Sequence, residues 1–226
     1  MPIPASLALT SPDDDLLCSP TTRLPIAVIL DTSGSMAGRP LEELQEALAL
    51  FLAEIARDPD ASACADLAVI TVGGSVMVHR PFSLASSGGT PALEADGATP
   101  LGEGVTAALR LLDERKAQYR AAGTPYYQPW LVILTDGAAT DDTARASAQT
   151  SRLVRERRLT VFPVGVGARA DLDQLRLLAG GARPMRLKGL AFGAFFRWLS
   201  ASVSCASRST PGQGVALPSP FSWVEL

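Results

Sequence analysis

The amino-acid sequence predicts one α/β domain with an open, mostly parallel six-stranded sheet, one antiparallel edge strand, and helices on both faces. Apolar runs such as LPIAVILD (24–31) and PWLVILTD (129–136) have the composition of strands that are buried on both faces of a parallel sheet. Segments with apolar residues at helical spacing alternate with these runs, and this alternation favours a parallel sheet covered by helices. The length of 226 residues, of which 47% are hydrophobic and 19% charged, suits a single domain.

The first strand is followed by an expected helix over residues 40–57. Pro40 suits the first turn of that helix, because proline lacks an N–H group that would remain unbonded there in any case. Apolar residues recur at helical spacing from Leu41 to Ile55. We expect the segment Asp58-Pro59-Asp60 to end the helix.

A β-hairpin is expected next. The strands 66–72 and 76–82 flank Gly73-Gly74-Ser75, and glycine between two apolar runs is typical of a tight turn. A long loop of small residues follows over 83–100. Long loops inside compact domains are often functional, so this segment is a candidate part of a site.

The second half of the domain continues the alternation of helix and strand. The first helix of this half is expected despite Gly102 and Gly104, and Asp141 or Asp142 is expected to cap the second. We expect helices at 101–120 and 142–157, strands at 129–136 and 159–167, a short helix marked by Leu172, Leu175 and Leu178, an edge strand in PMRLK (184–188), and a final amphipathic helix over 191–204 marked by Phe192, Phe195, Phe196, Leu199 and Val203.

The composition changes at both ends of the chain. Residues 1–22 are rich in Pro, Ser, Thr and Asp, and residues 206–226 are rich in Ser, Pro and Gly. We therefore expect a flexible N-terminal tail, a domain over 23–205 and a C-terminal tail. Trp223 lies in the second tail, and such a large aromatic side chain is expected to dock on the domain or on a partner.

Charge and cysteine content exclude several classes of protein. The net charge of −3 and the pI of about 5.2 do not provide the basic field of a nucleic-acid-binding protein. No apolar run approaches the roughly 18 residues that a membrane span needs, and the first residues lack the features of a secretory signal. The three scattered cysteines form no CxxC motif, which argues against zinc and suits a reducing cytosol. We expect a cytoplasmic protein that binds neither nucleic acid nor membranes.

Two of the buried strands end on an aspartate. Asp31 ends the first strand and is followed by Ser33 and Ser35 in DTSGS, and Asp136 ends the strand LVILTD. In open α/β sheets, ligands bind at the carboxyl ends of the strands near the topological switch point. We therefore expect the two aspartates to lie close together although they are far apart in the sequence.

The motif DTSGS allows four interpretations. In the first, Asp31 and the serines cap a turn before the helix, which is common. In the second, Asp-Thr belongs to an aspartic protease, but that motif has glycine where this chain has Ser33, and a matching second loop is lacking. In the third, Asp31 is the nucleophile of a haloacid-dehalogenase-type phosphohydrolase, but that chemistry needs a second acid at the position of Ser33.

The fourth interpretation is a metal site. Hard divalent cations prefer oxygen ligands, and Mg²⁺ keeps several waters when a protein binds it. Asp31 and Asp136 would neutralise one divalent ion, and the hydroxyl groups of Ser33 and Ser35 could ligate it directly. Thr99 in the loop DGATPLGEG is the candidate that completes the set. The expected cofactor is a divalent cation, with Mg²⁺ ahead of Mn²⁺ and Ca²⁺.

The motifs together resemble those of the von Willebrand factor A (VWA) family. DTSGS at the end of a first strand, the loop GATPLGEG and a strand that ends in LTDG follow one another in the expected order. The resemblance implies a single Rossmann-like VWA domain over roughly residues 24–204. That family has a metal-ion-dependent adhesion site (MIDAS) with the pattern Asp-x-Ser-x-Ser, a distant Thr and a distant Asp. The matching residues here are Asp31, Ser33, Ser35, Thr99 and Asp136.

Three stretches resemble a narrower group, the tellurium-resistance-associated TerY-like VWA proteins. These are RLPIAVILDTSGSMAG, LTDGAATDD and AFFRWLSASVS. The resemblance implies a cytoplasmic bacterial protein that acts with a protein kinase and a PP2C-type phosphatase. It also implies binding rather than catalysis, with a partner's acidic residue docked on the metal.

Two functional hypotheses follow. The favoured one is a metal-dependent protein-interaction module that is not an enzyme, a scaffold or adaptor in a TerY-type kinase and phosphatase system for stress or signalling. The alternative is a Mg²⁺-dependent phosphohydrolase with Asp31 as nucleophile. No catalytic set accompanies the aspartates, because the single histidine, His79, is expected on a strand away from them.

Overall fold

The computed structural model describes residues 21–210, 212 and 214–225. The expected N-terminal tail, residues 1–22, thus lies almost entirely outside the described residues. The elements follow in the order β1 (Leu24–Asp31), η1 (Gly34–Met36), α2 (Arg39–Arg57), α3 (Pro59–Cys64), β2 (Ala65–Gly73), β3 (Ser75–Leu84), α4 (Leu101–Ala122), β4 (Trp130–Thr135), α5 (Ala144–Arg155), β5 (Thr160–Val166), α6 (Leu172–Leu178), β6 (Met185–Leu187), α7 (Phe192–Ser207) and η2 (Pro220–Ser222).

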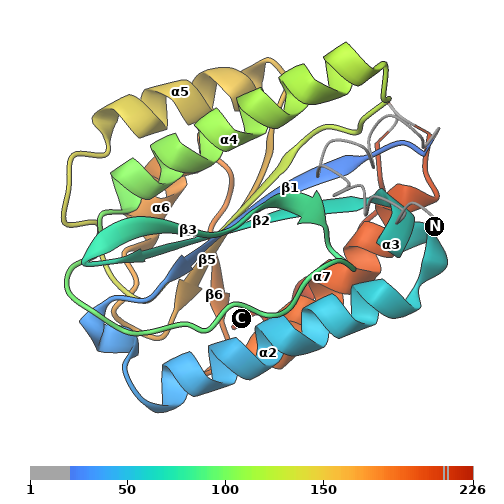
Figure 1. Cartoon of the computed structure of the whole chain (residues 1–226). Helices are drawn as coiled ribbons and strands as arrows, with labels where there is room; N and C mark the ends of the chain where they lie inside the picture. The colour runs from blue at the N-terminus through green and yellow to red at the C-terminus, as the bar shows by residue number, and fades with distance from the viewer. Residues whose placement is uncertain (1–20, 211, 213, 226) are drawn as a thin grey trace, which may run out of the picture.

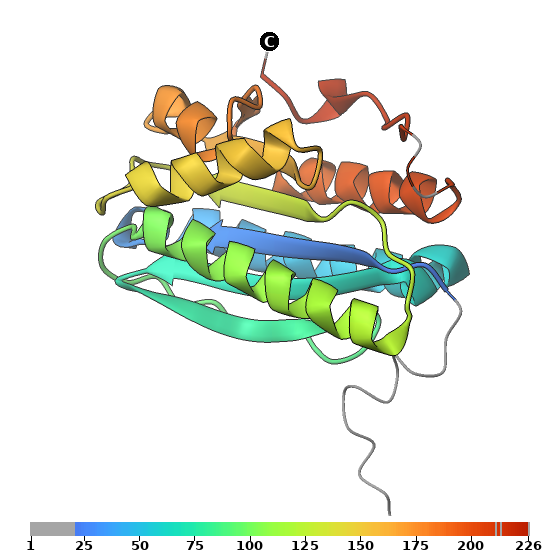
Figure 2. The same cartoon turned by 90° about the horizontal axis from the view of Figure 1, so that it is seen from above.

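The six strands form one sheet in the order β3-β2-β1-β4-β5-β6 (Figures 1 and 2). β1 pairs in parallel with β2 and β4, and the parallel arrangement continues through β5 to β6. Of these six strands in the described part of the chain, the hairpin partner β3 alone runs antiparallel, beside β2 at the edge of the sheet. The expected fold class is confirmed. The strand order reverses between β1 and β4, and this switch point is where the ends of the strands can hold a ligand.

Helices cover both faces of the sheet. Figure 1 shows α2, α3 and α7 on one face and α4, α5 and α6 on the other. All eight residues of β1 are buried, which explains why that strand is apolar up to its terminal Asp31 rather than alternating. Two hydrophobic cores result, one on each face, and β1 contributes side chains to both.

Gly104 lets α4 approach the sheet closely. A Cβ atom at this position would lie 2.4 Å from a methyl carbon of Val72 on β2, far inside van der Waals contact. The glycine that weakens the helical pattern in the sequence therefore serves packing between helix and sheet. This packing fixes the first turn of α4, which follows directly after the loop that carries Thr99.

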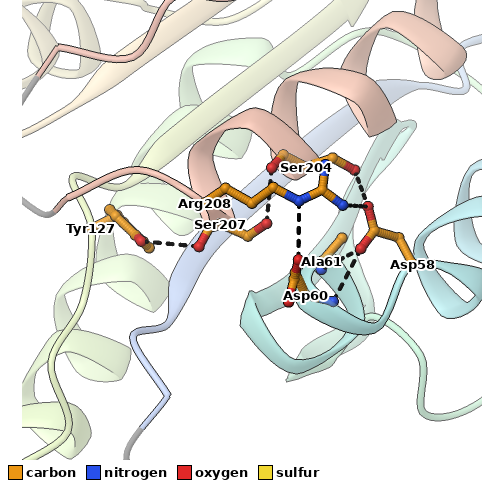
Figure 3. Close-up of polar contacts among 7 residues, drawn as sticks. All are labelled: Asp58, Asp60, Ala61, Tyr127, Ser204, Ser207 and Arg208. Atoms are coloured by element: carbon orange, nitrogen blue, oxygen red, sulfur yellow. Dashed lines mark hydrogen bonds and ion pairs between the residues drawn. The ribbon is translucent and has the colours of Figure 1, made fainter.

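The expected end of α2 at Asp58 proves to be a corner between two helices. Asp58 closes α2 and caps α3, with its Oδ1 accepting hydrogen bonds from the N–H groups of Asp60 and Ala61 at 3.0 and 3.2 Å. Its Oδ2 accepts hydrogen bonds from Ser204 at 2.6 Å and from Arg208 at 3.1 Å, at the end of α7 (Figure 3). The Ser204 hydrogen bond is the largest of the causes that lower the pKa of Asp58. The corner thus anchors the end of α7.

The C-terminal segment packs on the domain. Trp223 is fully buried, and its ring lies 4.9 Å from that of Phe195 and 5.3 Å from that of Trp198, both on α7. The backbone of the segment also pairs with β6, because Lys188 N–H donates to the Trp223 carbonyl at 2.8 Å. Figure 2 shows the segment running beside α7 at the edge of the sheet opposite β3. Of the two sequence-based expectations for Trp223, docking on the domain is the one observed.

Candidate metal centre

The parallel pairing of β1 and β4 brings the two aspartates together at the carboxyl ends of the strands. The register aligns Leu30 with Leu134, so that Asp31 and Asp136 follow at the ends of neighbouring strands. The N-termini of α2 and α4 lie at this same end of the strands (Figure 1). Topology alone therefore produces the juxtaposition that the sequence predicted.

Hydrogen bonds join four of the five predicted ligands. The N–H group of Ser33 donates to Asp31 Oδ1 at 2.9 Å, and the Oγ atoms of Ser33 and Ser35 lie 3.0 Å apart. Ser35 Oγ in turn donates to Asp136 Oδ1 at 2.6 Å. The side chains of Asp31, Ser33 and Asp136 are buried, whereas Ser35 is exposed. The cluster therefore opens to solvent on the side of Ser35.

Thr99 is placed beside the cluster by backbone contacts. Its carbonyl accepts a hydrogen bond from the N–H of Thr140 at 2.9 Å, in the loop that follows Asp136. Two residues earlier, the carbonyl of Gly97 accepts a hydrogen bond from the N–H of Gly34 at 3.0 Å, inside DTSGS. The loop that carries Thr99 is thus fixed to both aspartate loops, and Thr99 itself is buried.

Two residues that the sequence analysis did not select also contact the aspartates. Thr135 donates from its hydroxyl to Asp31 Oδ2 at 2.5 Å. Arg169 forms an ion pair with Asp136, with 3.1 Å between its Nη2 and Asp136 Oδ2. Thr135 immediately precedes Asp136, so the motif LTD offered a signal for it. Arg169 lies in the loop after β5, and no spacing rule singles it out.

The environment of Asp31 disfavours its negative charge. Burial raises the pKa of this carboxyl above its ordinary value of 3.8, and the charge of Asp136 adds to the rise. Hydrogen bonds from Thr135 and Ser33 act in the opposite direction, because they stabilise the ionised carboxylate. In the metal-free protein, Asp31 is therefore easier to protonate than an exposed aspartate, and a cation would relieve the electrostatic cost of its charge.

We expect the affinity for Mn²⁺ to fall as the pH is lowered through the raised pKa of Asp31, because a protonated carboxyl must lose its proton before it can ligate. The fall should begin at a higher pH than for an ordinary aspartate. For this group alone, the metal-free fold should gain stability over the same interval, since the folded state binds the proton more tightly than the unfolded state. Calorimetric titration with Mn²⁺ between about pH 7 and about pH 4 tests this. A constant affinity would contradict it.

The donor set suits a hard divalent cation. Two carboxylates and three hydroxyl groups offer only oxygen, which is the preference of Mg²⁺, Mn²⁺ and Ca²⁺. A carboxylate oxygen can accept a hydrogen bond and still offer a lone pair, so the contacts above leave capacity for a cation. Among the described residues, no cluster of three or more His, Cys, Asp or Glu side chains offers an alternative site. The assignment of the five ligands stays a prediction that the donor chemistry supports.

Comparison with known proteins decides the family. The model of the von Willebrand factor type A domain family matches residues 26–192, which is most of the chain. The chain belongs to this family. No curated protein matched the sequence significantly. The five predicted ligands all lie within the matched range.

Several solved structures share the fold. Proximal thread matrix protein 1 from the mussel byssus has a TM-score of 0.60 at 15% identity, over 82% of this chain and 49% of its own. A von Willebrand factor type A protein from Catenulispora acidiphila has a TM-score of 0.60 at 20% identity, over 82% of this chain and 43% of its own. The mussel protein has also been solved with a zinc-occupied MIDAS motif, with a TM-score of 0.59 and 15% identity over 82% of this chain and 48% of its own. The chain spans less than half of the length of each of these proteins.

Within the part of the chain that the structure describes, no helix is both long enough and apolar enough to cross a membrane.

Proposed function

We propose that this VWA domain is a metal-dependent protein-interaction module and not an enzyme. The observation that supports this most strongly is the hydrogen-bonded series from Asp31 through Ser33 and Ser35 to Asp136, at the switch point of the sheet. These residues match, in type and order, the adhesion-site motif of the family that the sequence resembles. The bound cation would supply a Lewis-acidic position that a carboxylate oxygen of a partner can occupy.

The protein's own residues prepare this position. Asp31 is held by Ser33 and Thr135 and cannot rotate without breaking two hydrogen bonds. Without a cation, the two aspartates repel an approaching carboxylate, and binding of a partner therefore depends on the ion. Ser35 lies on the exposed side of the cluster, which is the side from which a partner's acid would arrive.

The same contacts argue against Asp31 as the nucleophile of a phosphohydrolase. Only 1% of Asp31 is exposed, and the hydrogen bonds from Ser33 and Thr135 fix its orientation, so its alignment for attack on a phosphorus atom is hindered. Ser33 occupies the position where that chemistry needs a second acid, and a hydroxyl group cannot act as the general acid. The alternative hypothesis therefore has less support than docking.

We further propose that the protein acts in the cytoplasm as a scaffold or adaptor beside a protein kinase and a PP2C-type phosphatase. The support is the resemblance of RLPIAVILDTSGSMAG, LTDGAATDD and AFFRWLSASVS to the TerY-like proteins. Each candidate partner would place an aspartate or glutamate on the metal. The likeness to the solved structures contributes the fold alone to this proposal.

The experiment that tests the function is capture of purified TerY-system kinase and phosphatase on the immobilised chain, in Mg²⁺ and in EDTA. We expect at least one of them to be retained in Mg²⁺ and released by EDTA. Retention that is equal in both buffers would show that docking does not use the metal. In parallel, Mg²⁺-dependent hydrolysis of an aryl phosphate that is lost in Asp31→Asn would favour the phosphohydrolase instead.

A further inference from the structure

Arg169 reaches the metal centre from the solvent side. Its side chain is 73% exposed, whereas that of Asp136, with which it forms an ion pair, is 8% exposed. Asp136 is thus held on both oxygens, because Ser35 donates to Oδ1 at 2.6 Å and Arg169 donates to Oδ2 at 3.1 Å. The family motif does not include this arginine, and the proposed docking mechanism does not require it.

The loop that carries Arg169 is held in place next to the cluster. Gly167 adopts a φ of +69°, which glycine accommodates without strain, and the chain turns there at the end of β5. Arg186 on β6 donates a hydrogen bond to the Gly167 carbonyl and fixes this turn from the neighbouring strand. The position of Arg169 above Asp136 is therefore set by the fold and by a second side chain.

The charges of the cluster determine what it can bind. Asp31 and Asp136 carry two negative charges when ionised, and Arg169 returns one positive charge. A divalent cation bound to the two carboxylates alone would give a site of zero net charge, which could hold a further anion only by its coordination to the metal. With Arg169 in place, the same loaded site carries one net positive charge and attracts an anionic group.

We propose that Arg169 determines the specificity of the metal centre by weakening the binding of the cation while strengthening the binding of an acidic group to the loaded site. This inference rests on the proposed metal-dependent docking function. For the carboxylate partner of that function, it means that the cation and the guanidinium group attract the acidic group jointly. A residue with only a structural role would not move these two affinities in opposite directions.

The first test is calorimetric titration of the full chain with Mn²⁺. Arg169→Gln should bind Mn²⁺ roughly three- to tenfold more tightly than the wild type, because a nearby positive charge that repels the cation is removed. Arg169→Lys keeps the charge and should remain close to the wild type. The difference should shrink at about 1 M NaCl, since the exposed guanidinium group is then screened.

The matched control is Arg158→Gln. Arg158 is also largely exposed, and its guanidinium forms an ion pair with Glu156 at the same 3.1 Å. It precedes β5, however, and so lies at the amino ends of the parallel strands, away from the metal centre at their carboxyl ends. The Arg158→Gln substitution should leave the affinity for Mn²⁺ unchanged. Thermal melts of all variants in EDTA verify that each protein is folded before titration.

The second test uses acetate as the carboxylate probe at saturating Mn²⁺. Paramagnetic relaxation of the acetate methyl protons measures how much acetate contacts the protein-bound ion. Arg169→Gln should bind acetate at least about threefold more weakly than the wild type, because the loaded site has lost its net positive charge. Arg169→Lys should restore most of the acetate binding.

The outcomes separate the inference from the function on which it rests. Tighter Mn²⁺ and weaker acetate in Arg169→Gln would support the inference. Unchanged affinities for both, or a loss of both, in a protein whose wild type binds Mn²⁺ would overturn it and leave the metal centre intact. Failure of both the wild type and Arg169→Gln to bind Mn²⁺ would overturn the inference and the proposed function together.

Discussion

Asp31→Ala is expected to abolish measurable Mn²⁺ binding while the fold remains intact. The substitution removes one of the two carboxylates, and Asp136 alone cannot neutralise a divalent ion. The fold should survive because Asp31 lies at the end of β1, beyond the apolar part of the strand. Loss of the acceptor for Ser33 and Thr135 lowers the free energy of unfolding by about 1–3 kcal/mol. Removal of the buried Asp31 carboxyl, whose pKa is raised, offsets part of this loss.

Asp31→Asn separates charge from hydrogen bonding. The asparagine oxygen can still accept the hydrogen bond from the Ser33 N–H, so the local loop is preserved while the negative charge is lost. This variant should also fail to bind Mn²⁺, and its melting temperature should lie closer to that of the wild type than does that of Asp31→Ala. Calorimetric titration and thermal melts provide the two measurements.

The control is Asp113→Ala on α4, whose carboxylate is 54% exposed and pairs with Lys116. It should bind Mn²⁺ like the wild type. In the wild type, metal at ten times its dissociation constant should add about 1.4 kcal/mol of stability by mass action. The melting temperature of both Asp31 variants should not respond to metal. A response equal to that of the wild type would mean that the ion binds elsewhere.

The sequence contained most of the information for the sheet. The strand LPIAVILD is apolar up to its final aspartate because helices cover both faces of the sheet, and a parallel sheet buried on both sides accommodates such a strand. The end of α2 shows what local sequence patterns could not predict. Asp58-Pro59-Asp60 ends one helix as predicted and also caps α3, a helix of six residues that is too short to produce a recognisable apolar period.

The same distinction applies to the site. Asp31 and Asp136 could be predicted to meet because parallel neighbours present their carboxyl ends at one edge, which is a rule of topology. The motif predicted Thr99 as a ligand. In the structure, backbone hydrogen bonds that no sequence pattern reveals hold its loop against the loops of the two aspartates. Arg169 could not be predicted at all, because its contact depends on the path of one loop after β5.

Trp223→Ala is expected to lower the free energy of unfolding by about 3–5 kcal/mol, the range for removal of a large buried aromatic side chain. Trp223 is fully buried against Phe195 and Trp198, so its removal leaves a cavity beside α7. Since total stability is on the order of 5–15 kcal/mol, the loss is a large fraction of it. For a domain of this size, the melting temperature should fall by roughly 10 °C, measured by circular dichroism.

The matched control lies in the same segment. Phe221→Ala removes a side chain that is 73% exposed, and it should change the melting temperature by little. Trp223→Phe should recover part of the loss, because it restores an aromatic contact with Phe195. A wild-type melting temperature in Trp223→Ala would show that the segment does not stabilise the domain in solution. If the prediction holds, the C-terminal segment around Trp223 is part of the fold although its composition is that of a tail. The buried indole and the backbone pairing with β6 then stabilise the segment by more than the entropic cost of ordering it.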